Sequence, residues 1–203
     1  MFFVIAGLGN PGRAYRGNRH NAGFMVVDRL AQAASLSFSE SPYSGWSAEG
    51  RLGGRRVLLL KPATYMNRSG DSVAAAMRYF RLEPEDLLVV HDDLDLELGR
   101  IQVRRGGGSG GHRGVQSIMD SLGGGMFFRL RLGVGRPPAE REAADWVLEN
   151  FSPDEAASAQ EMIERGAQAV ETLLAEGLSA AMNRFNPWPV GSGRDPAAGK
   201  AGG

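Results

Sequence analysis

The chain has 203 residues, enough for one domain with its own core, and its 23 basic residues balance its 23 acidic residues. It contains no cysteine, which excludes a disulfide framework and any chemistry that depends on a thiolate. No apolar run approaches the roughly 20 residues of a membrane-spanning helix, and no secretory leader is recognisable. We therefore expect a cytoplasmic protein without a membrane partner.

Residues 2–6 are all apolar and predict a short buried strand. They run into GLGNPG at residues 7–12, which matches the glycine pattern of dinucleotide sites. Such a site needs a helix that begins at the third glycine and an acidic residue that ends a second strand. Here helical periodicity begins only at Asn21, and the acidic residue is missing. We therefore interpret the segment as a polar loop at the sheet edge, which carries Asn10, Tyr15, Asn18, His20 and Asn21.

The rest of the chain alternates between strand and helix patterns. Strands are expected at 46–51, 55–60, 87–90, 101–105 and 129–134, and helices at about 21–35, 69–80, 139–149 and 153–175, with a further helix through Ile118 and Leu122. Ser69 is predicted to be the N-cap of its helix. The alternation predicts an α/β fold, with a single domain at residues 1–186 and a twisted, mostly parallel mixed sheet flanked by helices. Residues 187–203 are rich in Pro, Gly, Ser and Ala, and predict a disordered tail.

The charges are unevenly distributed along the chain. Residues 97–136 hold seven arginines against two acids, a net charge of +5, whereas residues 137–165 hold eight acids against two arginines, a net charge of −6. A concentrated basic segment can bind a polyanion even when the whole protein is neutral. A solvated charged surface explains the same pattern, and charge alone does not separate the two.

Three polar loops each follow the end of an expected strand, at residues 7–21, 61–67 and 91–95. In α/β sheets, ligands bind outside the carboxyl ends of the strands. If the strands are neighbours, the topology brings together Asn10, His20, Asn67 and Asp92.

A histidine beside a carboxylate, without a cysteine or a serine elbow, suits general-base activation of water. Asp92 would hold the tautomer of His20, and the two asparagines would donate to a carbonyl oxygen as it gains charge. Each residue also has a plainer explanation. His20 alone fits a loop histidine, and Asn67 fits a turn. Asp92, Asp93 and Asp95 fit a divalent cation site, although they do not match an EF-hand loop.

Six motifs in order resemble bacterial peptidyl-tRNA hydrolases over residues 3–185: GLGNPG at 7–12, RHNAG at 19–23, TYMNRSG at 64–70, HDDLDL at 91–96, GGGSGGHRG at 106–114 and FRLRLGVGRP at 128–137. The resemblance implies a monomeric α/β domain that acts on peptidyl-tRNA without a metal or cofactor. It implies hydrolysis of the ester between the peptide and the 3′-terminal ribose of tRNA.

By position, His20 matches the family's catalytic base and Asp92 the carboxylate that orients it. Asn10 and Asn67 match asparagines that contact the peptidyl part and position the ester. The further residues assigned to substrate or tRNA binding are Tyr15 and Tyr65, at aromatic positions near the substrate, Arg104 and Arg131, at basic positions linked with the 5′-phosphate end of tRNA, and Asn21 and Arg113.

One position departs from the family pattern. The family usually reads GGHNG, with an asparagine that helps to position water or substrate, whereas this chain has His112-Arg113-Gly114. Arginine cannot accept a hydrogen bond and keeps its charge, so that role is dispensed with, altered or taken by another group such as His112. A contact of Arg113 with RNA phosphate suits its planar guanidinium. The arginine also leaves open an alternative, a non-catalytic RNA-binding protein on the same scaffold.

Overall fold

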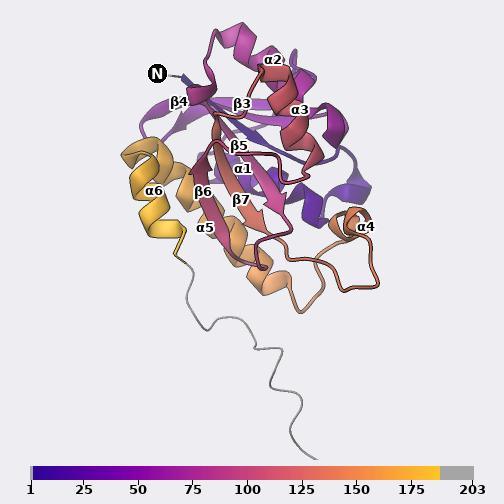
Figure 1. Cartoon of the computed structure of the whole chain (residues 1–203). Helices are drawn as coiled ribbons and strands as arrows, with labels where there is room; N and C mark the ends of the chain where they lie inside the picture. The colour runs from indigo at the N-terminus through magenta and orange to yellow at the C-terminus, as the bar shows by residue number, and fades with distance from the viewer. Residues whose placement is uncertain (1, 188–203) are drawn as a thin grey trace, which may run out of the picture.

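The computed structural model describes residues 2–187 and has one seven-stranded sheet between two layers of helices (Figure 1). The strands are β1 (Phe2–Gly7), β2 (Ser39–Ser41), β3 (Gly45–Leu52), β4 (Arg55–Pro62), β5 (Leu87–Asp93), β6 (Ile101–Arg105) and β7 (Phe128–Gly133). The α-helices are α1 (Ala22–Ala33), α2 (Ser69–Phe80), α3 (Arg113–Leu122), α4 (Ala143–Leu148), α5 (Ala156–Glu176) and α6 (Leu178–Phe185). Short 3₁₀ helices precede α1, at Arg13–Tyr15 and Arg19–Asn21, α2, at Met66–Arg68, and the strand β5, at Pro84–Asp86.

The sheet order is β2-β3-β4-β1-β5-β7-β6. The four central strands, β4, β1, β5 and β7, are parallel, whereas β2, β3 and β6 join by antiparallel pairs at the two sides. The predicted mixed sheet is confirmed, with its parallel part confined to the centre. From β1 the chain first builds β4 on one side of it and then β5 on the other, so the strand order reverses at β1. Ligands of open α/β sheets bind at such a reversal.

The central strands are buried on both faces, which explains their continuous apolar runs. On β1, Phe3 and Ile5 pack in the cluster formed with α1, α5 and α6, while Val4 and Ala6 pack in the cluster with α2 and α3. Figure 1 shows the same two layers, with α5 and α6 on one side of the sheet and α2 and α3 on the other. Among the described residues, no helix is both long enough and apolar enough to cross a membrane.

Several local predictions need correction. Ser69 is the first residue of α2, its N-cap is Arg68, and the Ser69 hydroxyl donates to the Met66 carbonyl at 2.9 Å instead of capping the helix. The helix expected at 139–149 is confined to Ala143–Leu148. The short edge strand β2 and the helix α6 were not predicted. Of the predicted tail at 187–203, residues 188–203 lie outside the described residues.

Candidate active site

Gly7, the last residue of β1, and Gly23, in the first turn of α1, allow the helix to pack closely against the sheet. A Cβ on Gly7 would lie 2.4 Å from the Gly23 carbonyl oxygen, and a Cβ on Gly23 would lie 2.3 Å from the Val90 carbonyl oxygen. Side chains at either position would clash with backbone, so only glycine lets the start of α1 press against the ends of β1 and β5. This approach holds His20, just before α1, over the end of β5.

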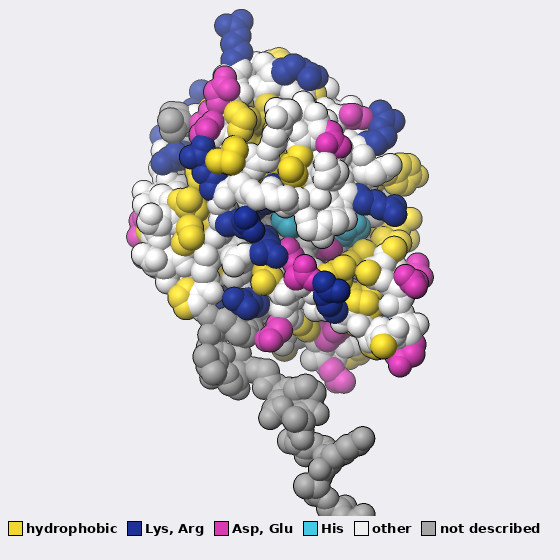
Figure 2. Space-filling model, viewed as in Figure 1, with side chains coloured by type: hydrophobic (Ala, Val, Ile, Leu, Met, Phe, Trp, Pro, Cys, Tyr) yellow, Lys and Arg dark blue, Asp and Glu magenta, His cyan; other side chains and the backbone are white. Residues whose placement is uncertain are grey.

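A cleft of about 640 Å³ opens at the carboxyl ends of the parallel strands. Its walls come from the loops after β1, β4 and β5, from the start of α3 and from α4. Figure 2 shows histidine side chains recessed on this face, with hydrophobic side chains gathered on one side of them. The predicted convergence is confirmed, because the cleft is lined by Asn10, His20, Asn67 and Asp92.

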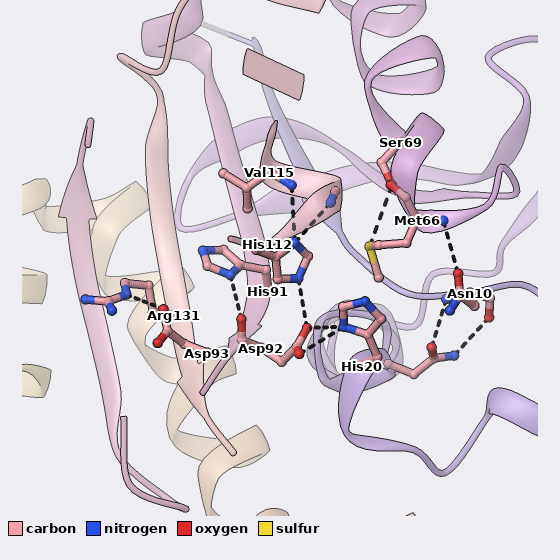
Figure 3. Close-up of polar contacts among 12 residues, drawn as sticks. Asn10, His20, Met66, Ser69, His91, Asp92, Asp93, His112, Val115 and Arg131 are labelled. Carbon is pink, nitrogen blue, oxygen red and sulfur yellow. Dashed lines mark hydrogen bonds and ion pairs between the residues drawn. The ribbon is translucent and has the colours of Figure 1, made fainter. Parts of the chain in front are cut away.

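His20 and Asp92 form the centre of the cleft (Figure 3). The Nδ1 atom of His20 lies 2.9 Å from each carboxylate oxygen of Asp92, whose side chain is 2% exposed. Burial alone would raise the pKa of Asp92, but attraction to His20 and His112 and their hydrogen bonds lower it below its usual range. An ionised carboxylate only accepts, so His20 Nδ1 carries the proton and its Nε2 keeps a free lone pair. That is the tautomer a general base requires.

His112 is a second donor to Asp92. Its Nε2 lies 2.9 Å from Asp92 Oδ1, while its Nδ1 accepts from the backbone N–H groups of Gly114 and Val115 at 3.1 and 3.2 Å. The imidazole therefore caps α3, as Figure 3 shows. Because Nδ1 accepts, the proton is on Nε2. From the sequence, His112 was considered only as a substitute for the family's asparagine. The helix expected through Ile118 and Leu122 begins at Arg113, which makes His112 its N-cap.

The ligand atoms of His20, Asp92 and His112 lie within 4.8 Å of one another, which raises the question of a metal site. A histidine binds a metal through an unprotonated nitrogen. The Nδ1 of His112 is occupied by two N–H donors, and its Nε2 carries the proton that faces Asp92. The cluster therefore fits a hydrogen-bond network, and a metal would have to displace the cap of α3.

We predict that His112→Asn will lower kcat/KM by about 10-fold in a folded protein. Asparagine keeps an acceptor for the α3 cap, but it cannot reach Asp92 as Nε2 does, so the carboxylate that holds His20 loses one of its two histidine donors. The measurement is kcat/KM at neutral pH, with the urea midpoint as a check on folding. An unchanged kcat/KM in a folded variant would mean that His112 only caps α3.

The loop that carries Asn10 is held in place by hydrogen bonds with Asn21. Asn21 is buried, accepts from the Asn10 backbone N–H at 2.8 Å and donates its own amide to the Asn10 carbonyl at 3.0 Å. The side-chain oxygen of Asn10 accepts from the Met66 N–H at 3.1 Å, which leaves its NH₂ group for the cleft. The structure thus places Asn21 as a support of Asn10, away from the cleft surface.

The remaining predicted residues divide into two groups. Tyr65, 69% exposed, and Arg113 line the cleft with Asn67, whereas Tyr15 does not. Arg104 and Arg131 lie outside the cleft on β6 and β7. Arg131 is paired with Asp93 at 2.6 Å and also contacts Gln102, and the Arg104 guanidinium packs against Gly107.

The cleft wall formed by α4 is anchored by Arg19, the neighbour of His20. Its side chain is 2% exposed and donates to the carbonyls of Glu149 and Asn150 and, at 2.6 Å, to the Glu155 carboxylate. Its guanidinium also lies 3.7 Å from the ring centre of Trp146 on α4. No local sequence pattern pointed to this arginine, which connects the loop of His20 to the wall formed by α4.

We predict that the folded protein loses stability in acid because of the buried side chain of His91. Its ring is buried beside His112 and Arg129, its Nδ1 donates to the Asp92 backbone carbonyl at 2.7 Å, and its Nε2 has no partner among the described residues. Burial, reinforced by His112, lowers the pKa of His91 to about 3. Between that value and the ordinary pKa of about 6.5, the unfolded chain binds the proton and the folded chain does not. Stability is therefore retained above pH 6.5 and lost below it.

In His91→Asn this contribution disappears, since asparagine keeps a donor for the Asp92 carbonyl but does not titrate. Urea unfolding between pH 6.5 and 4 should show a shallower fall of the unfolding free energy, by up to about 1.4 kcal/mol per pH unit. Val90→Ala, a buried change on the same strand, should lower stability at every pH and keep the wild-type slope. Equal slopes in His91→Asn and wild type would contradict the assignment.

Comparison with known proteins agrees with this geometry. The family model described as "Peptidyl-tRNA hydrolase" matches residues 4–193. Peptidyl-tRNA hydrolases from Desulforudis audaxviator and Symbiobacterium thermophilum are 50% and 49% identical, over 96% and 92% of this chain and 98% and 100% of theirs. The crystal structure of the Acinetobacter baumannii peptidyl-tRNA hydrolase superimposes with a TM-score of 0.87 at 37% identity, covering 92% of this chain and 95% of that one. The chain belongs to the peptidyl-tRNA hydrolase family.

Proposed function

We propose that this protein hydrolyses the ester between a peptide, or another N-blocked aminoacyl group, and the 3′-terminal ribose of tRNA. The observation that carries the proposal is the hydrogen bond from His20 Nδ1 to the buried Asp92 carboxylate, which leaves Nε2 as a base in the cleft. Family membership supports the same substrate class.

The mechanism follows from these groups. A water molecule attacks the ester carbonyl as His20 Nε2 takes one of its protons, and Asp92 stabilises the imidazolium that forms. The amide groups of Asn10 and Asn67 donate to the oxygen that becomes negative. When the tetrahedral intermediate collapses, the imidazolium returns the proton to the departing ribose oxygen. The products are free tRNA and a peptide with a free carboxylate.

The wider assignments remain part of the proposal. Tyr65 would lie against the substrate at the mouth of the cleft. Tyr15 and Asn21 would contribute to substrate binding from the loop that carries His20, with Asn21 doing so by holding Asn10 in place. Arg104 and Arg131 would contact tRNA phosphates, with Arg131 released from Asp93 on binding. We expect a monomer that acts in the cytoplasm without a metal or cofactor.

The test is release of a labelled N-acetyl-aminoacyl group from tRNA by the purified protein in EDTA, with the unblocked aminoacyl-tRNA as the control. Cleavage of the blocked ester alone is the expected result. Binding of tRNA without cleavage would instead favour the alternative, a non-catalytic RNA-binding protein in which Arg113 has changed the site.

A further inference from the structure

The two walls of the cleft differ in chemistry. The wall from α4 and the loop after β5 is apolar, with Leu94, Ala143, Val147 and Leu148, the last of them 44% exposed. The opposite wall is the loop that enters α3, where Gly110 and Gly111 present bare backbone. A Cβ on either glycine would meet no atom within 4 Å, and their φ angles of +58° and +81° favour glycine. One wall therefore suits an acyl group, and the other leaves room for a sugar.

The glycine wall also carries the cation of the cleft that lacks a counter-ion. Arg113 is exposed, and its side chain has no hydrogen-bond or ion-pair partner within residues 2–187. The acids nearby are already occupied, because Asp92 holds two histidines, Asp93 pairs with Arg131 and Asp95 pairs with Arg136. Arg113 is also the first residue of α3, where the helix dipole disfavours a positive charge. The fold therefore does not neutralise Arg113, and an anionic ligand would.

The position of Arg113 limits which anion it meets. It directly follows His112, whose ring centre lies 5.0 Å from that of His20, so its side chain starts beside the reacting groups. Behind the same wall, Arg129 donates to the carbonyls of Gly107 and Gly108 and holds the glycine loop in place. In the proposed substrate, the phosphate nearest to the scissile ester is the one on the 5′ side of the terminal nucleotide.

We propose that Arg113 binds this last phosphodiester, and thereby directs the terminal nucleotide against the glycine wall and the acyl group against α4. The inference rests on the proposed function. It makes Arg113 a specificity-determining residue for the RNA side of the ester. A planar guanidinium suits a phosphate, and charge-assisted hydrogen bonds of this kind contribute more than neutral ones.

The experiment alters the protein and the phosphate separately. The substrate is a short RNA hairpin with the single-stranded 3′ end of tRNA, acylated with an N-acetyl-aminoacyl group, in which the last linkage is either a phosphate or an uncharged methylphosphonate. We expect the methylphosphonate to lower kcat/KM of the wild type by about 10- to 100-fold. In Arg113→Gln it should lower kcat/KM by less than about twofold, since the contact is already absent.

Two controls isolate the contact. Arg51→Gln removes a charge from the β3–β4 hairpin, at the amino ends of the parallel strands, and should remain as sensitive to the methylphosphonate as the wild type. A methylphosphonate at the preceding linkage should affect the wild type and Arg113→Gln equally. If Arg113→Gln loses as much as the wild type on neutralisation of the last linkage, Arg113 does not bind that phosphate. If the wild type does not cleave the unmodified hairpin or blocked tRNA, the proposed function itself is wrong.

Discussion

Replacing His20 by alanine should lower kcat for the blocked ester by about 10²- to 10⁴-fold, while the Kd for uncharged tRNA stays within about twofold of the wild type. The reason is geometric. The lone pair of Nε2 is available only because Asp92 holds the proton on Nδ1, and no other base among the described residues contacts Asp92 with a free nitrogen in the cleft. Phosphate contacts, which contribute most of RNA affinity, do not involve this ring.

Single-turnover cleavage and filter binding of the same preparation separate the two effects. Asp92→Asn is the companion variant, because an amide can accept from one histidine but presents NH₂ to the other and no longer stabilises an imidazolium. It should lose kcat as well, with the fold retained. If His20→Ala lost tRNA affinity and turnover by equal factors, the assignment of His20 as the general base would be wrong.

The largest effect on stability is expected at Arg19. Replacing it by alanine should lower the unfolding free energy by about 3–5 kcal/mol, because the change leaves the Glu155 carboxylate without its ion-pair partner and the Asn150 carbonyl without its side-chain donor. The Glu149 carbonyl keeps only its bond from the backbone N–H of residue 19. The stacked contact with Trp146 is lost as well. Urea denaturation measures the change in free energy.

The matched control is Arg68→Ala, which breaks an exposed pair with Asp71 whose side chains are 71% and 49% exposed. Such pairs contribute at most about 1 kcal/mol. Because Arg19 connects the loop of His20 to α4, KM for the blocked ester should rise in Arg19→Ala at temperatures where the variant is folded. Similar losses of stability in Arg19→Ala and Arg68→Ala would show that Arg19 is not the anchor of this wall.

Much of the fold follows from local patterns. Burial on both faces leaves a continuous apolar run, which predicts β1, β4 and β5. Burial on one face leaves a helical period, which predicts α1 and α2. β2 has three residues with no buried side chain, and its sequence therefore shows neither pattern. The cap of α2 differs from expectation because the Ser69 hydroxyl donates to the Met66 carbonyl, three residues before the helix begins, instead of accepting from the first turn.

The amino-acid sequence by itself determined which polar residues meet, since parallel strands place their carboxyl ends at one edge, and Asn10, His20 and Asn67 follow such an end. Asp92 was expected in the loop after a strand at 87–90, but β5 continues to Asp93, and Asp92 lies in its last residues. Only the tertiary structure decided what these groups can do. His20 and Asp92 are 72 residues apart, Asp92 and His112 are 20 apart, and Arg19 and Glu155 are 136 apart. The tautomer of His20 and the buried pair of Arg19 and Glu155 depend on partners that only the folded chain brings within hydrogen-bonding distance. The lack of a counter-ion at Arg113 within residues 2–187 is likewise a property of the folded chain, and no local pattern encodes it.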